Sequence, residues 1–110
     1  EHESRAVACA QDMRTAIRNV NRQLDHDVRI GIGINSGEAV VGNMGSDSRF
    51  DYSAIGDAVN VAARLESATK GAGEDILIGE TTANKVLDQM TYVGTISVKG
   101  KEEQLKVYTV

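Results

Sequence analysis

The stretch from Val28 to Ile34, VRIGIGI, constrains the fold more than any other part of this 110-residue chain. Its aliphatic residues alternate with Arg29, Gly31 and Gly33, which is the two-residue period of a strand with one apolar face. The other face has no side chain at either glycine, so a second backbone, a partner or a ligand can come close there. The pattern therefore predicts a β-strand that is approached closely from its glycine face.

The segment before this strand predicts an amphipathic helix over residues 3–24. Apolar residues recur there at three- and four-residue steps, namely Ala6, Ala10, Met13, Ile17, Val20 and Leu24. We expect this helix to pack on a sheet. A dimeric coiled coil is the alternative, although the segment holds only about three heptads and its stripe is rich in alanine. Cys9 lies beside the stripe and is expected to be a buried or half-buried, inert thiol.

The segments after the strand predict an α+β fold. Asn35–Gly37 is turn chemistry, and we interpret the following EAVVGNMG as the returning strand of a hairpin with VRIGIGI. RFDYSAI predicts a short strand, followed by a helix from about Asp57 to Lys70, with Asp57 as its N-cap. ILIG then predicts a buried strand, ETTANKVLDQM a short helix, and YVGTISVKGKEEQLKVYTV a final hairpin. This order indicates one domain, with a mixed, mostly antiparallel sheet and helices mainly on one face.

Composition and motifs exclude several classes of function. Twelve basic and sixteen acidic residues give a net charge of −4, which argues against non-specific binding to nucleic acid or to a membrane surface. A single cysteine excludes an intrachain disulfide and fits a reducing compartment, so we expect a cytoplasmic location. GIGINSG fails as a dinucleotide-binding motif, because Ser36 stands at the third glycine position and no helix is expected to follow.

The predicted helix after Gly56 carries an unusual polar face. Asn60, Arg64 and Ser67 share one stripe of that helix. The opposite stripe is apolar and consists of Ala58, Val61, Ala62, Leu65 and Ala68. Asparagine is a weak helix former, while an amide and a guanidinium are suitable donors for ribose oxygens and a phosphate. The spacing alone leaves two interpretations open, a solvated helix face and a nucleotide-binding face.

Two segments, VRIGIGINSGEAVVGNMGS and RFDYSAIGDAVNVAARLES, resemble the catalytic domain of the class III adenylate/guanylate cyclases, in the form common in bacteria. The final SVKGKEEQLKVYTV resembles the last hairpin of that domain, and the similarity covers almost the whole chain. Its most specific part is G-D-x-V-N-x-A-x-R at residues 56–64. The resemblance implies the ferredoxin-like sandwich of the nucleotide cyclases, with residues 1–110 forming a partial domain that lacks the N-terminal metal-binding segment.

The resemblance also implies a reaction and a role for individual residues. Members of the family convert a nucleoside triphosphate into the 3′,5′-cyclic monophosphate and pyrophosphate, with two Mg²⁺ or Mn²⁺ ions, between two domains of a head-to-tail homodimer. Asn60 would orient the ribose, Arg64 would stabilise charge at the α-phosphate, and Lys99 would meet the terminal phosphates, with Lys101 as a substitute. Ser53 matches the position that recognises the purine. Serine or threonine there is typical of adenylate cyclases of this type, so ATP is the expected substrate.

The departures from the family pattern concern the metal ions. The family's two metal aspartates and its base-contacting lysine precede the helix at 3–24, and Asp12, Asp25 and Asp27 do not fit the metal-binding strand motif. We therefore assign no metal ligand in this chain and expect the 110 residues alone to be inactive. The parent protein is expected to be a cyclase that acts in signal transduction. A guanylate cyclase and a catalytically silent cyclase homology or dimerisation module are the alternatives. A diguanylate cyclase is not supported, because no G-G-[DE]-[DE]-F signature occurs.

Overall fold

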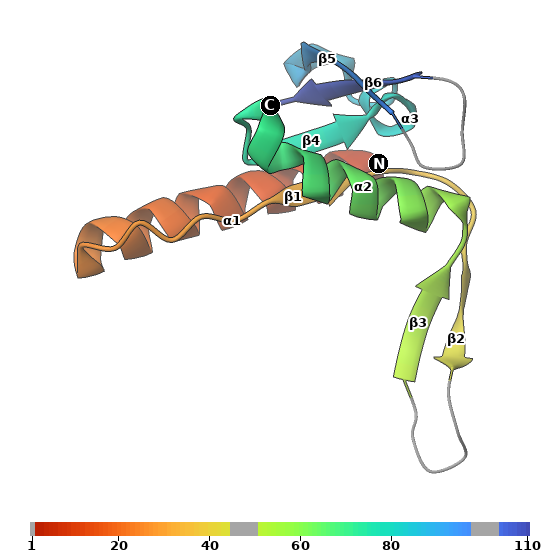
Figure 1. Ribbon diagram of the computed structural model, residues 1–110, viewed down its shortest axis with the longest axis horizontal. Coiled ribbons are helices and arrows are strands. Elements are labelled where there is room, and N and C mark those ends of the chain that lie inside the picture. The colour runs from red at the N-terminus through yellow and green to blue at the C-terminus, as the bar shows by residue number, and fades with distance from the viewer. Residues whose placement is uncertain (1, 45–50, 98–103) are drawn as a thin grey trace.

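The computed structural model describes residues 2–44, 51–97 and 104–110. Its main sheet has the strand order β1-β4-β6-β5 and consists of β1 (Ile32–Ile34), β4 (Ile76–Gly79), β6 (Gln104–Thr109) and β5 (Thr91–Ser97). β1 is parallel to β4, whereas β6 is antiparallel to both of its neighbours. A second, antiparallel pair, β2 (Val40–Met44) and β3 (Asp51–Ile55), extends away from the main sheet as an arm (Figure 1).

Two long helices cover opposite faces of the main sheet. Helix α1 (His2–Leu24) packs on Ile76 and Ile78, and helix α2 (Asp57–Ala72) packs on Leu77. Successive residues of a strand point to opposite faces, so β4, whose residues are all buried, contributes to both layers of the core. The short helix α3 (Glu80–Ala83) adds Ala83 to the α1 side. The predicted α+β class is confirmed, and α2 is the one described helix on its side of the sheet.

The glycine face of β1 lies directly under α2. A methyl group added at Gly33 would collide with the carbonyl oxygen of Ala62 and lie 2.5 Å from the backbone nitrogen of Glu66. A methyl group at Gly31 would collide with the Thr69 hydroxyl. The predicted close approach is therefore confirmed, and the approaching backbone is that of α2.

The expected hairpin between VRIGIGI and EAVVGNMG is wrong. β1 is shorter than predicted and pairs with β4, while β2 pairs with β3. The polar side chains after β1 explain the difference. Asn35 Nδ2 donates to the carbonyl oxygen of Ala58 at 3.1 Å, and Ser36 Oγ lies 2.7 Å from Thr82 Oγ1. These bonds direct the segment after β1 toward α2 and α3 instead of back along β1.

The face of α1 that contacts the sheet is shifted around the helix from the predicted stripe, with which it shares Ala10 and Ile17. Its buried and half-buried residues are Glu3, Val7, Ala10, Gln11, Arg14, Ile17 and Asn21. Three residues of the predicted stripe, Met13, Val20 and Leu24, are exposed by 49%, 40% and 60%. The expectation of a buried or half-buried Cys9 is also wrong, because the rotation leaves this thiol exposed.

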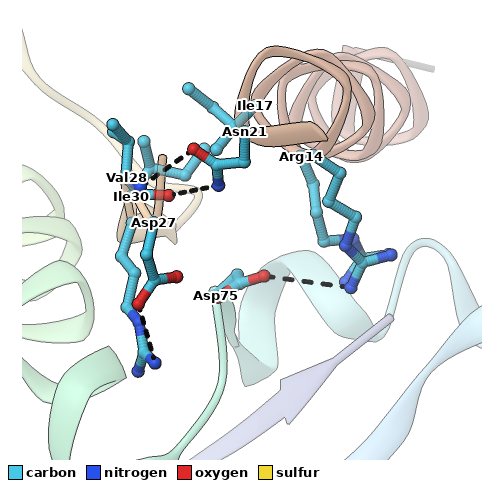
Figure 2. A pocket seen from close by; sticks show the side chains of 9 residues that line it. Arg14, Ile17, Asn21, Asp27, Val28, Ile30 and Asp75 are labelled. Carbon is cyan, nitrogen blue, oxygen red and sulfur yellow. Dashed lines mark hydrogen bonds and ion pairs between the residues drawn. The ribbon is translucent and has the colours of Figure 1, made fainter. Parts of the chain in front are cut away.

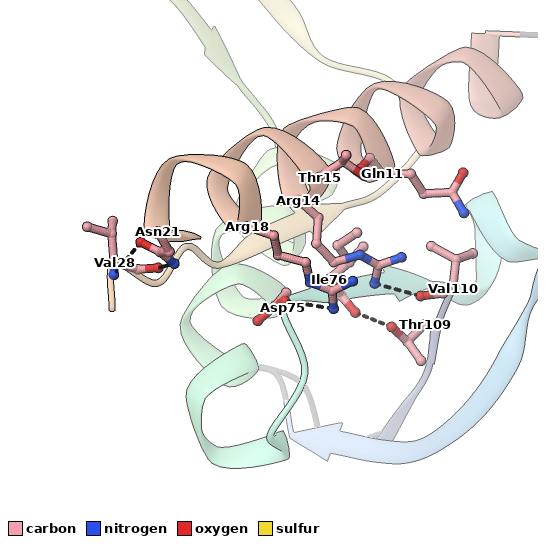
Figure 3. Close-up of polar contacts among 10 residues, drawn as sticks. All are labelled: Gln11, Arg14, Thr15, Arg18, Asn21, Val28, Asp75, Ile76, Thr109 and Val110. Atoms are coloured by element: carbon pink, nitrogen blue, oxygen red, sulfur yellow. Dashed lines mark hydrogen bonds and ion pairs between the residues drawn. The ribbon is translucent and has the colours of Figure 1, made fainter. Parts of the chain in front are cut away.

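Polar side chains account for the rotation of α1 (Figure 3). Arg14 Nη1 donates to the carbonyl oxygen of Val110 at 2.8 Å. The Asn21 amide accepts a hydrogen bond from the Val28 nitrogen at 2.9 Å and donates to the Val28 carbonyl oxygen at 2.8 Å. Helix α1 is thus held by apolar packing near its N-terminus and by hydrogen bonds to backbone groups further along. Packing of this helix on the sheet is confirmed.

Smaller differences concern the ends of elements. Gly56, and not Asp57, is the N-cap of α2, with φ at 157°. A methyl group at Gly56 would lie 3.0 Å from the carbonyl oxygen of Glu38, so a side-chain cap does not fit there. The expected ETTANKVLDQM helix is divided into α3 and a 3₁₀ turn, η1 (Leu87–Gln89), because Val86 adopts a φ of −136° and is buried. The final hairpin is confirmed. Within the described ranges, no helix combines the length and apolarity needed to cross a membrane.

We expect the substitution Gly33→Ala to lower the free energy of unfolding by about 1–3 kcal/mol, because the methyl group must push the α2 backbone away from β1. Gly71→Ala is the matched control. Gly71 lies in α2 with nothing within 4 Å of an added methyl group, and alanine favours the helix. Urea unfolding followed by circular dichroism measures both variants, and equal midpoints would contradict the close contact.

Candidate functional site

The outer face of α2 carries two of the sequence-predicted site residues. Val61 and Leu65 point into the core, with 5% and 0% of their surface exposed, while Asn60 and Arg64 are exposed on the opposite side of the helix. Residues four apart on a helix lie one turn above each other, so the amide and the guanidinium form one polar surface. The structure therefore confirms the predicted division of α2 into a core stripe and a polar stripe.

Arg64 connects α2 to the final hairpin, at the end where β5 stops and β6 begins. Its Nε donates a hydrogen bond to the carbonyl oxygen of Ser97 at 3.1 Å. Ser97 is the last residue of β5 and pairs with Gln104, the first residue of β6. The Gln104 side chain adds a second link, because its Nε2 donates to Ser97 Oγ at 2.9 Å. The site thus includes two residues that sequence reasoning did not find.

Three predicted site residues cannot be placed by their side chains. Lys99 and Lys101 lie outside the described residues, although the hairpin residues that flank their segment, Ser97 and Gln104, lie next to Arg64. For Ser53 only the backbone is described, in β3 opposite Gly42. The phosphate role of the two lysines and the purine role of Ser53 stay predictions.

Asn35 fixes the N-terminal turn of α2, and sequence reasoning treated it only as a turn residue. Its Nδ2 donates to the carbonyl oxygen of Ala58, two residues before Asn60. Its Oδ1 accepts a hydrogen bond from Thr81 Oγ1 at 3.0 Å, which ties the same amide to α3. An asparagine amide both donates and accepts, so a single side chain can join three elements. The local sequence shows the amide but not its partners.

The carboxylates of the described residues do not form a metal site. No group of three or more histidine, cysteine, aspartate or glutamate side chains converges within the ranges that the structure describes. Two of the aspartates pair with arginines instead. Asp27 Oδ2 lies 3.5 Å from Arg29 Nη2, and Asp75 Oδ2 lies 4.0 Å from Arg18 Nη2 (Figure 2). The expectation that the ligands of the divalent ions lie outside this chain stays a prediction.

Two hollows of the described surface lie beside the C-terminal halves of α1 and α2. One cavity of about 190 Å³ contains the paired aspartates and lies between the C-terminal half of α1 and the segment before β1 (Figure 2). A larger one of about 520 Å³ follows the C-terminal half of α2, where Ser67 and Lys70 line it. Among the described residues, Asn60 and Arg64 line neither of these two hollows.

Comparison with known proteins gives one consistent family. The family described as adenylate and guanylate cyclase catalytic domain matches residues 1–110. An adenylate cyclase of Anabaena cylindrica is 40% identical over 88 residues, which cover 76% of this chain and 18% of that protein. Adenylate cyclase 1 of Rhizobium meliloti is 33% identical over 113 residues, which cover 100% of this chain and 17% of that protein. The chain thus corresponds to less than a fifth of each of these relatives.

Solved structures agree with these relatives. The crystal structure of a guanylyl cyclase has a TM-score of 0.81 and 38% identity, over 98% of this chain and 57% of that one. The crystal structure of the adenylyl cyclase CyaB from P. aeruginosa has a TM-score of 0.69 and 35% identity, over 94% of this chain and 53% of that one. The arrangement of helices and strands is therefore shared with a guanylyl cyclase and with an adenylyl cyclase.

We expect Asn35→Asp to destabilise the chain by about 1–3 kcal/mol, because the carboxylate keeps the size of the amide but cannot donate to the Ala58 carbonyl oxygen. Hydrogen exchange should accelerate at the Asn60 amide, whose bond to the Gly56 carbonyl closes the first turn of α2. Asn84→Asp, at an exposed residue that ends α3, is the control. Unchanged unfolding and exchange in Asn35→Asp would show that this amide does not hold α2.

Proposed function

The chain belongs to the adenylate and guanylate cyclase catalytic domain family, and on this basis we propose that its parent protein is an adenylate cyclase. The parent would convert ATP into 3′,5′-cyclic AMP and pyrophosphate for signal transduction. The observation that carries the proposal is the exposed pair Asn60 and Arg64 on the outer face of α2, within the G-D-x-V-N-x-A-x-R segment. A cytoplasmic location is part of the proposal, since it fits the single cysteine.

The proposed roles follow from the chemistry of the side chains. The Asn60 amide would hold the ribose so that its 3′-hydroxyl lies in line with the α-phosphate. The Arg64 guanidinium would stabilise the charge that develops on that phosphate through its Nη nitrogens, because Nε is bonded to Ser97. Lys99, or Lys101 in its place, would neutralise the terminal phosphates, which leave as pyrophosphate. Positioning and charge neutralisation are the main demands of phosphoryl transfer.

The proposal places this chain on one side of a composite site. Asn60 and Arg64 would face the nucleotide across the interface of a head-to-tail homodimer, and the ligands for two Mg²⁺ or Mn²⁺ ions would come from outside these 110 residues. No group of three or more histidine, cysteine, aspartate or glutamate side chains converges among the described residues, so we assign the ion ligands to none of them. We therefore derive no step through the metal ions from this chain, and the 110 residues alone should form no cyclic nucleotide.

ATP is proposed over GTP because of Ser53, while the similarity to a guanylyl cyclase structure favours GTP as the second candidate. In the parent protein, Ser53→Cys should lower the ratio of ATP to GTP turnover, because a weakly hydrogen-bonding thiol replaces the hydroxyl expected to recognise the purine. Turnover of both nucleotides, with Thr95→Ala as an exposed control on β5, measures the effect. An unchanged ratio would remove Ser53 from substrate selection, and a parent that uses only GTP would refute the adenylate assignment.

In the parent protein, Arg64→Ala should lower kcat by about 10²–10³, which is the usual effect of removing one donor to a charge that develops in the transition state. Cyclic AMP formation measures it. Lys70→Ala is the control, because it removes an exposed basic side chain from the same helix without touching the proposed site. Normal activity of Arg64→Ala would refute the proposed catalytic role of the outer face of α2.

Mixing subunits tests the composite site separately. An inactive Arg64→Ala subunit combined with a subunit that lacks the metal ligands should regain activity, because one of the two sites in the mixed dimer is then complete. Absence of recovery, with dimer formation confirmed by light scattering, would contradict a site shared between subunits.

A further inference from the structure

We propose that Ser97 and Gln104 are positioning residues for Arg64, and that the hydrogen bond between their side chains sets the orientation of the guanidinium toward the nucleotide. This inference rests on the proposed function of Arg64. It concerns the end of the final hairpin at which β5 stops and β6 begins. Neither residue lies on α2 or within the motif at residues 56–64.

The guanidinium needs an external anchor. Arg64 is exposed, and a long exposed side chain is free to adopt many rotamers in water. The hydrogen bond from Nε to the Ser97 carbonyl oxygen, at 3.1 Å, removes much of this freedom. A guanidinium is planar, so fixing Nε in one direction also fixes the plane of both Nη nitrogens. These nitrogens remain available for two oxygens of a phosphate.

The anchor itself depends on the pairing of two strands. Ser97, the last residue of β5, pairs with Gln104, the first residue of β6. The bond from Gln104 Nε2 to Ser97 Oγ, at 2.9 Å, joins the two strands across this pair. It therefore limits movement of the Ser97 backbone, and with it the direction of the carbonyl oxygen that holds Arg64.

Ser97 and Gln104 also flank the segment that contains Lys99 and Lys101. An effect that passes through Arg64 must therefore be separated from one that passes through these lysines. A residue that acts through Arg64 affects a group whose contribution is made in the transition state, so its loss lowers kcat. A residue that acts through the lysines would lower activity through the terminal phosphates, and this loss would persist after Arg64 is removed. The effect of each variant in the Arg64→Ala background therefore distinguishes the two routes.

The test uses Gln104→Leu and Ser97→Ala in the parent protein, assayed for cyclic AMP formation. Gln104→Leu keeps the bulk of the side chain without its donor, and Ser97→Ala removes the acceptor but keeps the carbonyl group. Each variant should lower kcat about two- to tenfold, as expected for one lost hydrogen bond, with KM and the unfolding midpoint unchanged. The double variant should be no worse than either single one, because both remove the same bond. Thr95→Ala, two residues earlier on β5, should behave as the unchanged protein.

The Arg64→Ala background decides the outcome. There, Gln104→Leu should have no further effect, since the residue that it positions is gone. A further loss in that background, a raised KM with normal kcat, or full activity of both single variants would each overturn the inference. If Arg64→Ala itself is fully active, the proposed function of this face fails, whereas an inactive Arg64→Ala with active Gln104→Leu and Ser97→Ala refutes only the positioning role.

Discussion

The contact between the α2 backbone and the glycine face of β1 is the interaction on which the rest of this structure depends. Gly33 allows the helix to lie so close that even a methyl group would meet the backbone of Ala62 and Glu66. That depth brings Val61 and Leu65 into the same cluster as Leu77 and Val107. Once this side of α2 is buried, helix geometry alone turns Asn60 and Arg64 to the opposite side.

Close packing on the sheet does not by itself fix the position of α2, and polar contacts add further constraints. The Asn35 amide donates a hydrogen bond to the first turn of α2. The Ser97 carbonyl oxygen accepts a hydrogen bond from the Arg64 side chain on the outer face of the same helix. Catalytic groups must be fixed to within about 0.5 Å, which requires support from neighbouring residues. The two anchors come from different parts of the sheet, so α2 is fixed against sliding as well as against tilting.

Sequence periodicity was sufficient for most elements and for the two faces of α2, but it failed for strand pairing and for the contact face of α1, which depend on distant residues. The partner of β1 depends on Asn35 and Ser36, whose bonds to α2 and α3 no local pattern reveals. The contact face of α1 was misplaced because Arg14 and Asn21 bond to backbone groups, whereas hydrophobic periodicity treats such residues as solvent-facing. The exposed position of Asn60 and Arg64 followed from spacing, whereas their role is implied only by the resemblance and stays a prediction.

The exposure of Arg64 carries a physical consequence for any reaction at this face. Two unit charges 4 Å apart interact by about 1 kcal/mol in bulk water but by about 4 kcal/mol at the effective dielectric constant near a protein surface. Arg64 is exposed to water, so its attraction for a phosphate lies toward the lower of these two values. Its effect grows only when a second surface covers α2 and excludes water. A second surface that covered the exposed Asn60 and Arg64 would therefore strengthen any contact that this face makes with a phosphate.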